Sequence, residues 1–335
     1  MQFGLLLPHF GEHASRSRVL DGARLAEDLG FDSVWVRDHL IFHPHGMEGT
    51  DRTFYEAFLS LAAISSITQR IILGTGTVIP HRHPIHLAQC AAILSFYSGG
   101  RVILGFGAGN FDHEFEAIGL GGIFRPDLVE ENVQILRRLW TEDHVSFQGR
   151  FYHFEEVELH PKPVKPIPIW YGGNTPASAR RAVEYCDGWI PGRITLTTFK
   201  KRVAQMRKRS AELGRPMPTT GAIPITSIAK DRQTAVNSVN LPGLLKNANN
   251  QKWWVRPPHG EFRTVDDLEG SVLFGSPDDI VQEVLKLHEA GLQHLVFDFR
   301  FRFADFFDQV KLLGERVLPV LRQELTRSQA SRMPA

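Results

Sequence analysis

The chain has 335 residues, of which 42% are hydrophobic and 22% charged, as in ordinary globular proteins. Lys and Arg number 38 against 37 Asp and Glu, and no basic stripe or polybasic tail indicates nucleic acid or a membrane surface as a partner. The two cysteines, Cys90 and Cys186, are too few for a disulfide framework or a cysteine-based zinc site. Because there is no secretory signal pattern and no apolar run of ~18 residues, we expect a cytoplasmic protein.

Short apolar runs alternate with longer amphipathic runs along the chain. The predicted strands are residues 3–7, 33–36, 70–78, 102–106, 167–171, 189–190, 223–229 and 294–299. The predicted helices are residues 17–29, 54–68, 85–96, 128–140 with Asp127 as N-cap, 176–185, 198–213, 277–290 and 304–324. This alternation predicts parallel strands with helical crossovers. Eight such units favour one closed (β/α)8 TIM barrel over an open doubly wound sheet.

Three segments depart from the alternation. Residues 147–154 are expected to form a small hairpin before the fifth strand. Residues 240–270 have no sustained helical or strand period and are predicted to be the one substantial insertion. The barrel is expected to span residues 1–325, followed by a flexible tail of residues 326–335.

Histidines and glycines concentrate after the predicted strands, at the end of a TIM barrel that carries active sites. Asp38 and His39 follow the second strand, and a glycine-rich loop leading to Asn110 follows the fourth. His81, His83 and nearby histidines offer imidazole ligands, but no His-Glu-x-x-His helix occurs, so we expect no metal. The glycine loop lacks the acidic residue of a dinucleotide fingerprint and is better explained by close approach of the backbone to a ligand.

A glycine turn after the fifth strand suggests an anion site. Gly172, Gly173 and Asn174 lead into a helix with Pro176 in its first turn, so backbone N–H groups at the helix start face the barrel mouth. Arg193, after the sixth strand, would contact the same anion. A phosphate-bearing cofactor explains both features, and a simple tight turn is the alternative.

Taken in order and spacing, the motifs resemble the bacterial luciferase-like superfamily of flavin- and deazaflavin-dependent oxidoreductases. The matching segments are residues 3–8, 26–35 followed by Asp38 and His39, 72–75, 83–89, 100–109, 168–173 and 186–189. The resemblance implies a TIM barrel with a flavin-type ring at its C-terminal mouth, a mobile insertion over the ring, and a homodimer.

The Asp38-His39 pair resembles the branch of this superfamily that uses coenzyme F-420, a deazaflavin. The match implies that His39 is a catalytic proton donor or an organiser of the site, and that Gly76-Thr77 is a non-proline cis peptide under the ring. It assigns cofactor binding to Asp38, Gly76, Thr77, Gly107, Asn110, Gly172, Gly173, Asn174 and Arg193. A sugar-phosphate dehydrogenase of this branch has a catalytic Glu at the position of Asn110, and Asn cannot exchange a proton, so that activity is in doubt here.

The predicted function is hydride transfer between coenzyme F-420 and an unidentified small organic substrate. Two alternatives stay open: an FMN-dependent monooxygenase that inserts one oxygen atom from O2, and a barrel that binds a ligand without catalysis. Trp253 and Trp254 either line a lid or pin the insertion to a core. The predicted substrate pocket is Phe42, His45, His113, Trp253, Trp254 and Arg300.

Overall fold

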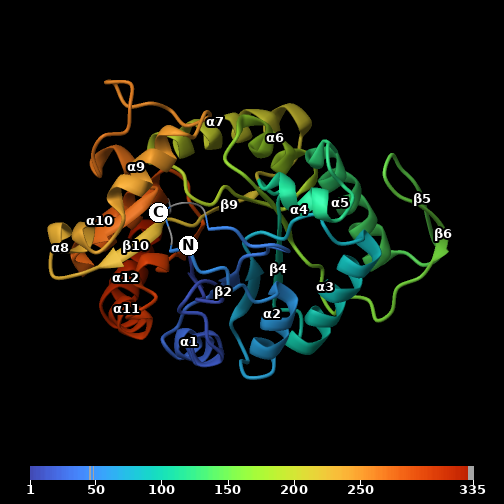
Figure 1. Cartoon of the computed structure of the whole chain (residues 1–335), viewed down its shortest axis with the longest axis horizontal. Helices are drawn as coiled ribbons and strands as arrows, with labels where there is room; N and C mark the ends of the chain where they lie inside the picture. Colours follow the sequence, from blue (N-terminus) through green and yellow to red (C-terminus); the bar gives the residue numbers. More distant parts are fainter. Residues whose placement is uncertain (45–46, 48, 331–335) are drawn as a thin grey trace.

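A closed barrel of parallel strands forms the centre of the computed structural model, which describes residues 1–44, 47 and 49–330. The strand order around the barrel is β1-β12-β9-β8-β7-β4-β3-β2 (Figure 1), which confirms the predicted TIM barrel. The strands are β1 (Gln2–Leu6), β2 (Ser33–Val36), β3 (Ile72–Thr75), β4 (Val102–Phe106), β7 (Ile169–Gly172), β8 (Gly188–Ile190), β9 (Thr219–Ala222) and β12 (His294–Phe297).

Helices surround the barrel (Figure 1). They are α1 (Arg16–Asp28), α2 (Ala57–Ser65), α3 (Pro84–Ser98), α4 (Asp112–Ala117), α5 (Arg125–Thr141), α6 (Pro176–Tyr185), α7 (Leu196–Leu213), α10 (Pro277–Glu289), α11 (Phe306–Leu312) and α12 (Leu318–Ala330), with the π-helical turn η3 (Leu313–Val317) joining the last two. Side chains fix several starts: Ser276 and Asp279 form a capping box at α10. The prediction of Asp127 as an N-cap is wrong, because α5 begins two residues earlier, with Pro126 in its first turn.

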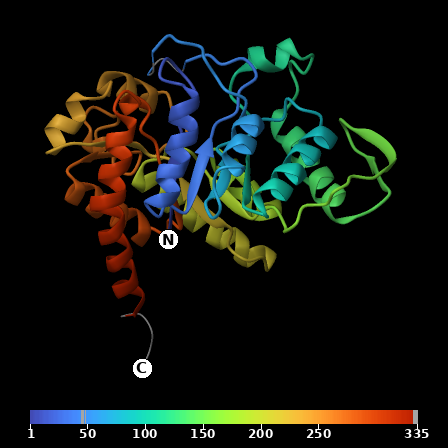
Figure 2. The same cartoon turned by 90° about the horizontal axis from the view of Figure 1, so that it is seen from below.

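The C-terminal helix is longer than the sequence predicted. Residues 326–330, expected in a flexible tail, continue α12, which extends away from the barrel in Figure 2. Residues 331–335 lie outside the described part of the chain.

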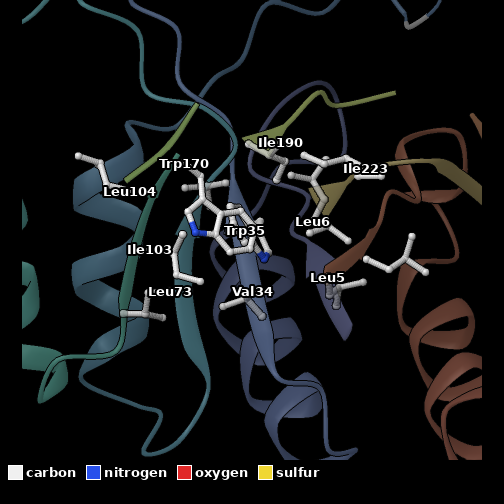
Figure 3. Packing of buried hydrophobic residues seen from close by; sticks show 14 of the residues in the cluster. Leu5, Leu6, Val34, Trp35, Leu73, Ile103, Leu104, Trp170, Ile190 and Ile223 are labelled. Carbon is white, nitrogen blue, oxygen red and sulfur yellow. The ribbon is translucent and has the colours of Figure 1, made fainter. Parts of the chain in front are cut away.

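Two tryptophans fill the barrel interior. Trp35 and Trp170 lie side by side with their ring centroids 5.6 Å apart, surrounded by aliphatic side chains (Figure 3). A Cβ atom at Gly74 would lie 2.4 Å from the Trp35 ring, and one at Gly188 would lie 2.4 Å from the Trp170 ring. Glycine at these two strand positions therefore makes room for the rings, and the barrel is a packed core rather than a pore.

The seventh barrel strand is not the predicted one. Residues 223–229 were expected in the barrel, but the barrel strand is β9, and β10 (Ile225–Ile228) pairs in parallel with β11 (Val272–Gly275) outside it. Pro224 lies between β9 and β10 and has no N–H group for a sheet hydrogen bond, so it separates the two strands. Residues 223–229 were predicted as the barrel strand because they form the more apolar run, whereas β9 contains two threonines and a glycine.

Both predicted additions to the barrel are present. The hairpin consists of β5 (Val145–Gln148) and β6 (His153–Val157), which pair antiparallel and project from the molecule (Figures 1 and 2). The insertion contains α9 (Leu241–Asn249), which corrects the prediction that it has no helical period, and the short turn η1 (Asp266–Leu268). The helix α8 (Arg232–Asn237) precedes it. It has its own small hydrophobic cluster, which includes Leu244, Ala248, Trp254, Phe262 and Leu268. Across the described residues, we find no helix with the length and apolarity to span a membrane.

Candidate active site

A cavity of about 280 Å³ lies at the carboxyl ends of the barrel strands, where TIM barrels hold their active sites. It brings together several predicted site residues, namely Asp38, His39, Gly76, Thr77, Asn110, Arg193 and Arg300. The rest of its lining is Leu6, Arg37, Ile79, Gly109, Gly192, Ile223, Asn247 and Gln251. The polar residues that follow separate strands in the sequence therefore converge at one site.

Glycines leave part of the cavity wall free of side chains. A Cβ atom at Gly76 would come within 3.1 Å of the Ile223 side chain across the cavity, whereas one at Gly192 would meet nothing within 4 Å. The peptide bond between Gly76 and Thr77 is cis, as the family resemblance implied. Bare backbone at these positions suits the close approach of a flat ligand.

Gly107 and Gly172 act one layer below the cavity. A Cβ atom at Gly107 would lie 2.5 Å from Thr77 Oγ1, and one at Gly172 would lie 2.8 Å from Thr77 Cγ2. Neither glycine lines the cavity. In this structure they make room for the Thr77 side chain, so their predicted contact with a cofactor stays a prediction.

His39 forms a wall of the cavity with its side chain 7% exposed. Its Nδ1 lies 3.1 Å from Glu114 Oε2, and its Nε2 lies 3.5 Å from an Nη of Arg37. The ring packs against Phe42, Phe54 and Phe111 at centroid distances of 5.6, 5.3 and 5.3 Å. These contacts fix the imidazole in an apolar setting with its polar edge toward charged groups.

Glu114 on α4 is fully buried behind His39. Its Oε1 accepts hydrogen bonds from the backbone N–H groups of Leu40 (2.8 Å) and Ile41 (3.0 Å). Burial by itself raises the pKa of Glu114, but the hydrogen bonds from His39 and the two backbone groups outweigh it and lower the pKa below its usual value. The structure therefore places a carboxylate against the imidazole.

Asp38 is the centre of a second buried network. Its carboxylate accepts hydrogen bonds from both terminal nitrogens of Arg82, at 2.6 and 2.9 Å, and from the Ile79 N–H at 3.1 Å. Burial lowers the pKa of Arg82, but the Asp38 carboxylate and the contact with Glu56 raise it further than burial lowers it. Asp38 thus ties the loop after β2 to the loop after β3 while it lines the cavity, and its direct contact with a cofactor stays a prediction.

The glycine turn after β7 lies beside the cavity rather than in its wall. Thr175 caps α6 by accepting a hydrogen bond from the Ser178 N–H, and Gly173 has φ +118°. A separate cleft of about 490 Å³ begins at this helix start and reaches Arg180 and Trp253. Asn174 lines neither space, but its Nδ2 donates to Oε1 of Gln251, 3.1 Å away, and Gln251 belongs to the cavity wall.

The insertion covers the cavity with carboxamide groups. An Nη of Arg193 donates to Asn247 Oδ1 at 3.0 Å, and Gln251 Nε2 lies 3.4 Å from the same oxygen. Both amides come from α9 or the residues just after it. The insertion therefore contributes polar side chains to the mouth.

The two tryptophans of the insertion lie elsewhere. Trp254 is 5% exposed and packs against Phe262 in the cluster of the insertion. Trp253 is 56% exposed and lines the cleft beside α6. Neither lines the cavity of His39 in this structure.

The other predicted substrate residues divide between two places. Phe42 and Arg300 line a second, aromatic cavity of about 170 Å³, and Arg300 is shared with the cavity of His39. His113 packs on His43, with ring centroids 4.1 Å apart, and lines neither cavity. His45 lies outside the described residues.

Sequence reasoning missed Glu114, Arg37, Asn247 and Gln251 as site residues. Glu114 lies 75 positions from His39 in the sequence, on a six-residue helix that the apolar pattern did not indicate. Its only signal was its place shortly after the fourth strand, where barrel residues reach the mouth. Within the part of the chain that the structure describes, no group of three or more His, Cys, Asp or Glu side chains is arranged to hold a metal ion.

Comparison with known proteins agrees with this fold. The chain matches the luciferase-like monooxygenase family over residues 1–294 and belongs to that family. It is 30% identical to an F420-dependent glucose-6-phosphate dehydrogenase of Nakamurella multipartita, over 93% of this chain and 94% of the relative. It is 34% identical to an F420-dependent hydroxymycolic acid dehydrogenase of Mycobacterium tuberculosis, over 56% of this chain and 51% of the relative. A solved F420-dependent secondary alcohol dehydrogenase in complex with an F420-acetone adduct shares the fold, with a TM-score of 0.79 at 23% identity over 96% of this chain and 98% of that chain.

Proposed function

We propose that the protein is an oxidoreductase that transfers a hydride between coenzyme F-420 and a small organic substrate. The observation that carries the proposal is His39, a largely buried imidazole in the wall of a cavity that Gly76, Gly109 and Gly192 also line. The names of the similar dehydrogenases support the choice of cofactor.

The residues of the cavity fit a flat ring with a phosphate-bearing tail. The Gly76-Thr77 and Gly109-Asn110 segments would hold the ring, because they line the cavity and the two glycines expose their backbone there. Asp38 and Arg193 would contact it at its edges. Gly172, Gly173 and Asn174 would bind the phosphate region near the start of α6.

His39 would move the proton that accompanies hydride transfer. Bound coenzyme F-420 would supply a hydride acceptor for a carbinol carbon and, in its reduced form, a hydride donor for a carbonyl carbon. As the C–H bond of the alcohol breaks, His39 Nε2 accepts the hydroxyl proton and the C–O bond becomes a carbonyl. In the reverse direction His39 donates that proton to the carbonyl oxygen. Asn247 and Gln251 over the mouth would help to exclude water.

The substrate we propose is a small secondary alcohol or its carbonyl partner. Glucose-6-phosphate, the substrate in the name of one relative, is the first specific candidate to assay. Asn110 argues against glucose-6-phosphate as the substrate. Its carboxamide lines the cavity at the position where a sugar-phosphate dehydrogenase of the F-420 branch has a catalytic Glu, and a carboxamide cannot exchange a proton.

Cofactor titration separates the proposal from its alternatives. Calorimetry with coenzyme F-420 and with FMN should give tighter binding of F-420, and equal or tighter binding of FMN would favour a monooxygenase and overturn the proposal. Anaerobic assays with alcohols and glucose-6-phosphate should then bleach the visible absorbance of oxidised F-420. Tight binding of F-420 without turnover of any alcohol or carbonyl compound would support the non-catalytic binding protein.

We also propose that the protein is a homodimer, as the family resemblance implies. Large apolar side chains are exposed on α2 and α3, where Leu59, Phe96 and Tyr97 are 73, 56 and 66% exposed. The two helices are neighbours, so these side chains offer an apolar face to a second copy. A cytoplasmic location stays a prediction of the sequence.

A further inference from the structure

We propose that Glu114 is a positioning residue that selects the ring tautomer of His39, an inference that rests on the proposed role of His39 in proton transfer. Glu114 reaches the imidazole from α4, where its Oε2 lies 3.1 Å from His39 Nδ1, and is itself fully buried. It is absent from the lining of the cavity and so acts through His39.

The two oxygens of Glu114 have different partners. Oε1 accepts from the backbone N–H groups of Leu40 and Ile41 at 2.8 and 3.0 Å. Oε2 lies nearer to His39 Nδ1 than Oε1 does, at 3.1 against 3.3 Å. One oxygen therefore holds the loop after β2, and the other is directed at the imidazole.

An ionised carboxylate only accepts hydrogen bonds. His39 Nδ1 must therefore carry the hydrogen, and in a neutral imidazole this leaves Nε2 with the lone pair. A guanidinium nitrogen of Arg37, a group that can only donate, lies 3.5 Å from Nε2, which agrees with an acceptor at Nε2. The carboxylate also stabilises the imidazolium that forms when His39 takes up a proton.

Glu114→Gln separates this role from a structural one. The amide oxygen of Gln can replace Oε1 and keep both backbone hydrogen bonds, so the loop keeps its support. The amide NH2 group then stands in the place of Oε2 and donates toward Nδ1. His39 can accept this hydrogen bond only by moving its own hydrogen to Nε2, which reverses the tautomer. Replacing the carboxylate behind a catalytic histidine by an amide is known to have this consequence.

The first measurement needs no cofactor. Nitrogen-15 NMR of histidine-labelled protein, with His39 assigned by its loss in His39→Asn, should find the hydrogen on Nδ1 in the wild type and on Nε2 in Glu114→Gln. Glu116→Gln removes the same charge from an exposed position of the same helix and should leave the tautomer on Nδ1. A wild-type His39 with its hydrogen on Nε2, or an unchanged tautomer in folded Glu114→Gln, would overturn the inference.

The second measurement uses the loaded enzyme. Glu114→Gln should lower kcat by ~100-fold or more while KM and the affinity for F-420 stay within about threefold, since the lost group aids only proton transfer. An unchanged kcat would contradict the positioning role. If the wild type turns over no substrate with F-420, the proposed function fails, but the tautomer measurement still decides what Glu114 does to His39.

Discussion

His39 combines chemistry and placement in one residue. Its imidazole is suited to proton transfer near neutral pH, and its side chain is held by three phenylalanine rings and Glu114 at the cavity wall. A residue that only supported the loop would be exchangeable for another side chain of similar bulk. The proposed reaction requires a group at this position that takes up and releases a proton.

We therefore expect His39→Ala to lower kcat by ~100-fold or more, because general acid–base catalysis contributes about that much. The measurement is steady-state reduction of coenzyme F-420 at saturating substrate. His86→Ala, an exposed histidine on α3, is the matched control and should retain full activity. An unchanged kcat in folded His39→Ala would remove His39 from the mechanism.

Glycine is required at the different positions of the site for different reasons. Gly76 makes room for the Ile223 side chain at the cavity wall, whereas Gly107 and Gly172 make room for the Thr77 side chain. Gly173 adopts φ +118°, a backbone conformation in which any other residue is strained. The family resemblance assigned all four to cofactor binding. Only the packed structure distinguishes a glycine that faces a ligand from one that faces a threonine.

At the scale of the element, the insertion is anchored rather than loose. Arg202 on α7 donates to the Trp253 carbonyl at 2.6 Å and to the Asn174 carbonyl at 3.2 Å. Trp254 fills the cluster of the insertion with Phe262 and Leu244. These contacts fix the segment that carries Gln251 to the cavity wall, and they favour the core-anchor interpretation of the tryptophan pair.

Trp254→Ala should accordingly lower the free energy of unfolding by about 3–5 kcal/mol, the usual cost of removing a buried aromatic side chain. Trp253→Ala is the matched control and should change it by less than ~1 kcal/mol, because this side chain is 56% exposed. Urea titration followed by circular dichroism measures both. Equal effects of the two substitutions would contradict the anchoring role of Trp254.

The order of helices and strands was predictable wherever the local apolar pattern matches the element that the barrel forms. The run of residues 33–36 is a buried strand in both, and the hairpin at residues 147–154 needed only its central Gly149. The pattern failed at β9, since a four-residue strand with threonines and a glycine has little apolar signal and is recognised only by its partners β8 and β12. It failed at Glu114 for a similar reason, because the contact with His39 is made by the fold and not by neighbouring residues.

For the whole molecule, the exposed apolar face of α2 and α3 predicts association. Light scattering after size exclusion should give twice the chain mass of 37.8 kDa. Leu59→Glu should give the single mass with unchanged circular dichroism, because a charge at an apolar interface opposes association and Leu59 is 73% exposed within one chain. Leu213→Glu, an exposed leucine at the end of α7, should stay dimeric. A monomeric wild type would refute the proposal.

Two buried histidines should make the stability of the barrel depend on pH. His294 packs edge-on against both Trp35 and Trp170, with its Nε2 2.7 Å from Ser33 Oγ. His9 follows β1, and its Nε2 accepts a hydrogen bond from the Arg37 N–H at 2.9 Å. Burial lowers the pKa of each from 6.5 to about 3, because both rings lack water to solvate a charge. Each histidine is therefore neutral in the folded protein.

Stability should consequently fall as the solution is acidified. The unfolded chain binds a proton at each histidine below pH 6.5, whereas the folded chain does so only near pH 3, so protons favour unfolding across this window. Two such groups give a slope of up to about 2.7 kcal/mol per pH unit, and the effect is absent above pH 7. Urea titrations between pH 7 and 5, before most carboxylates protonate, measure it. His294→Gln should remove about half of this slope, while His160→Gln at an exposed site should remove none. A wild-type free energy of unfolding that is independent of pH across this range would contradict a lowered pKa at both histidines, and half of the expected slope would contradict it at one of them.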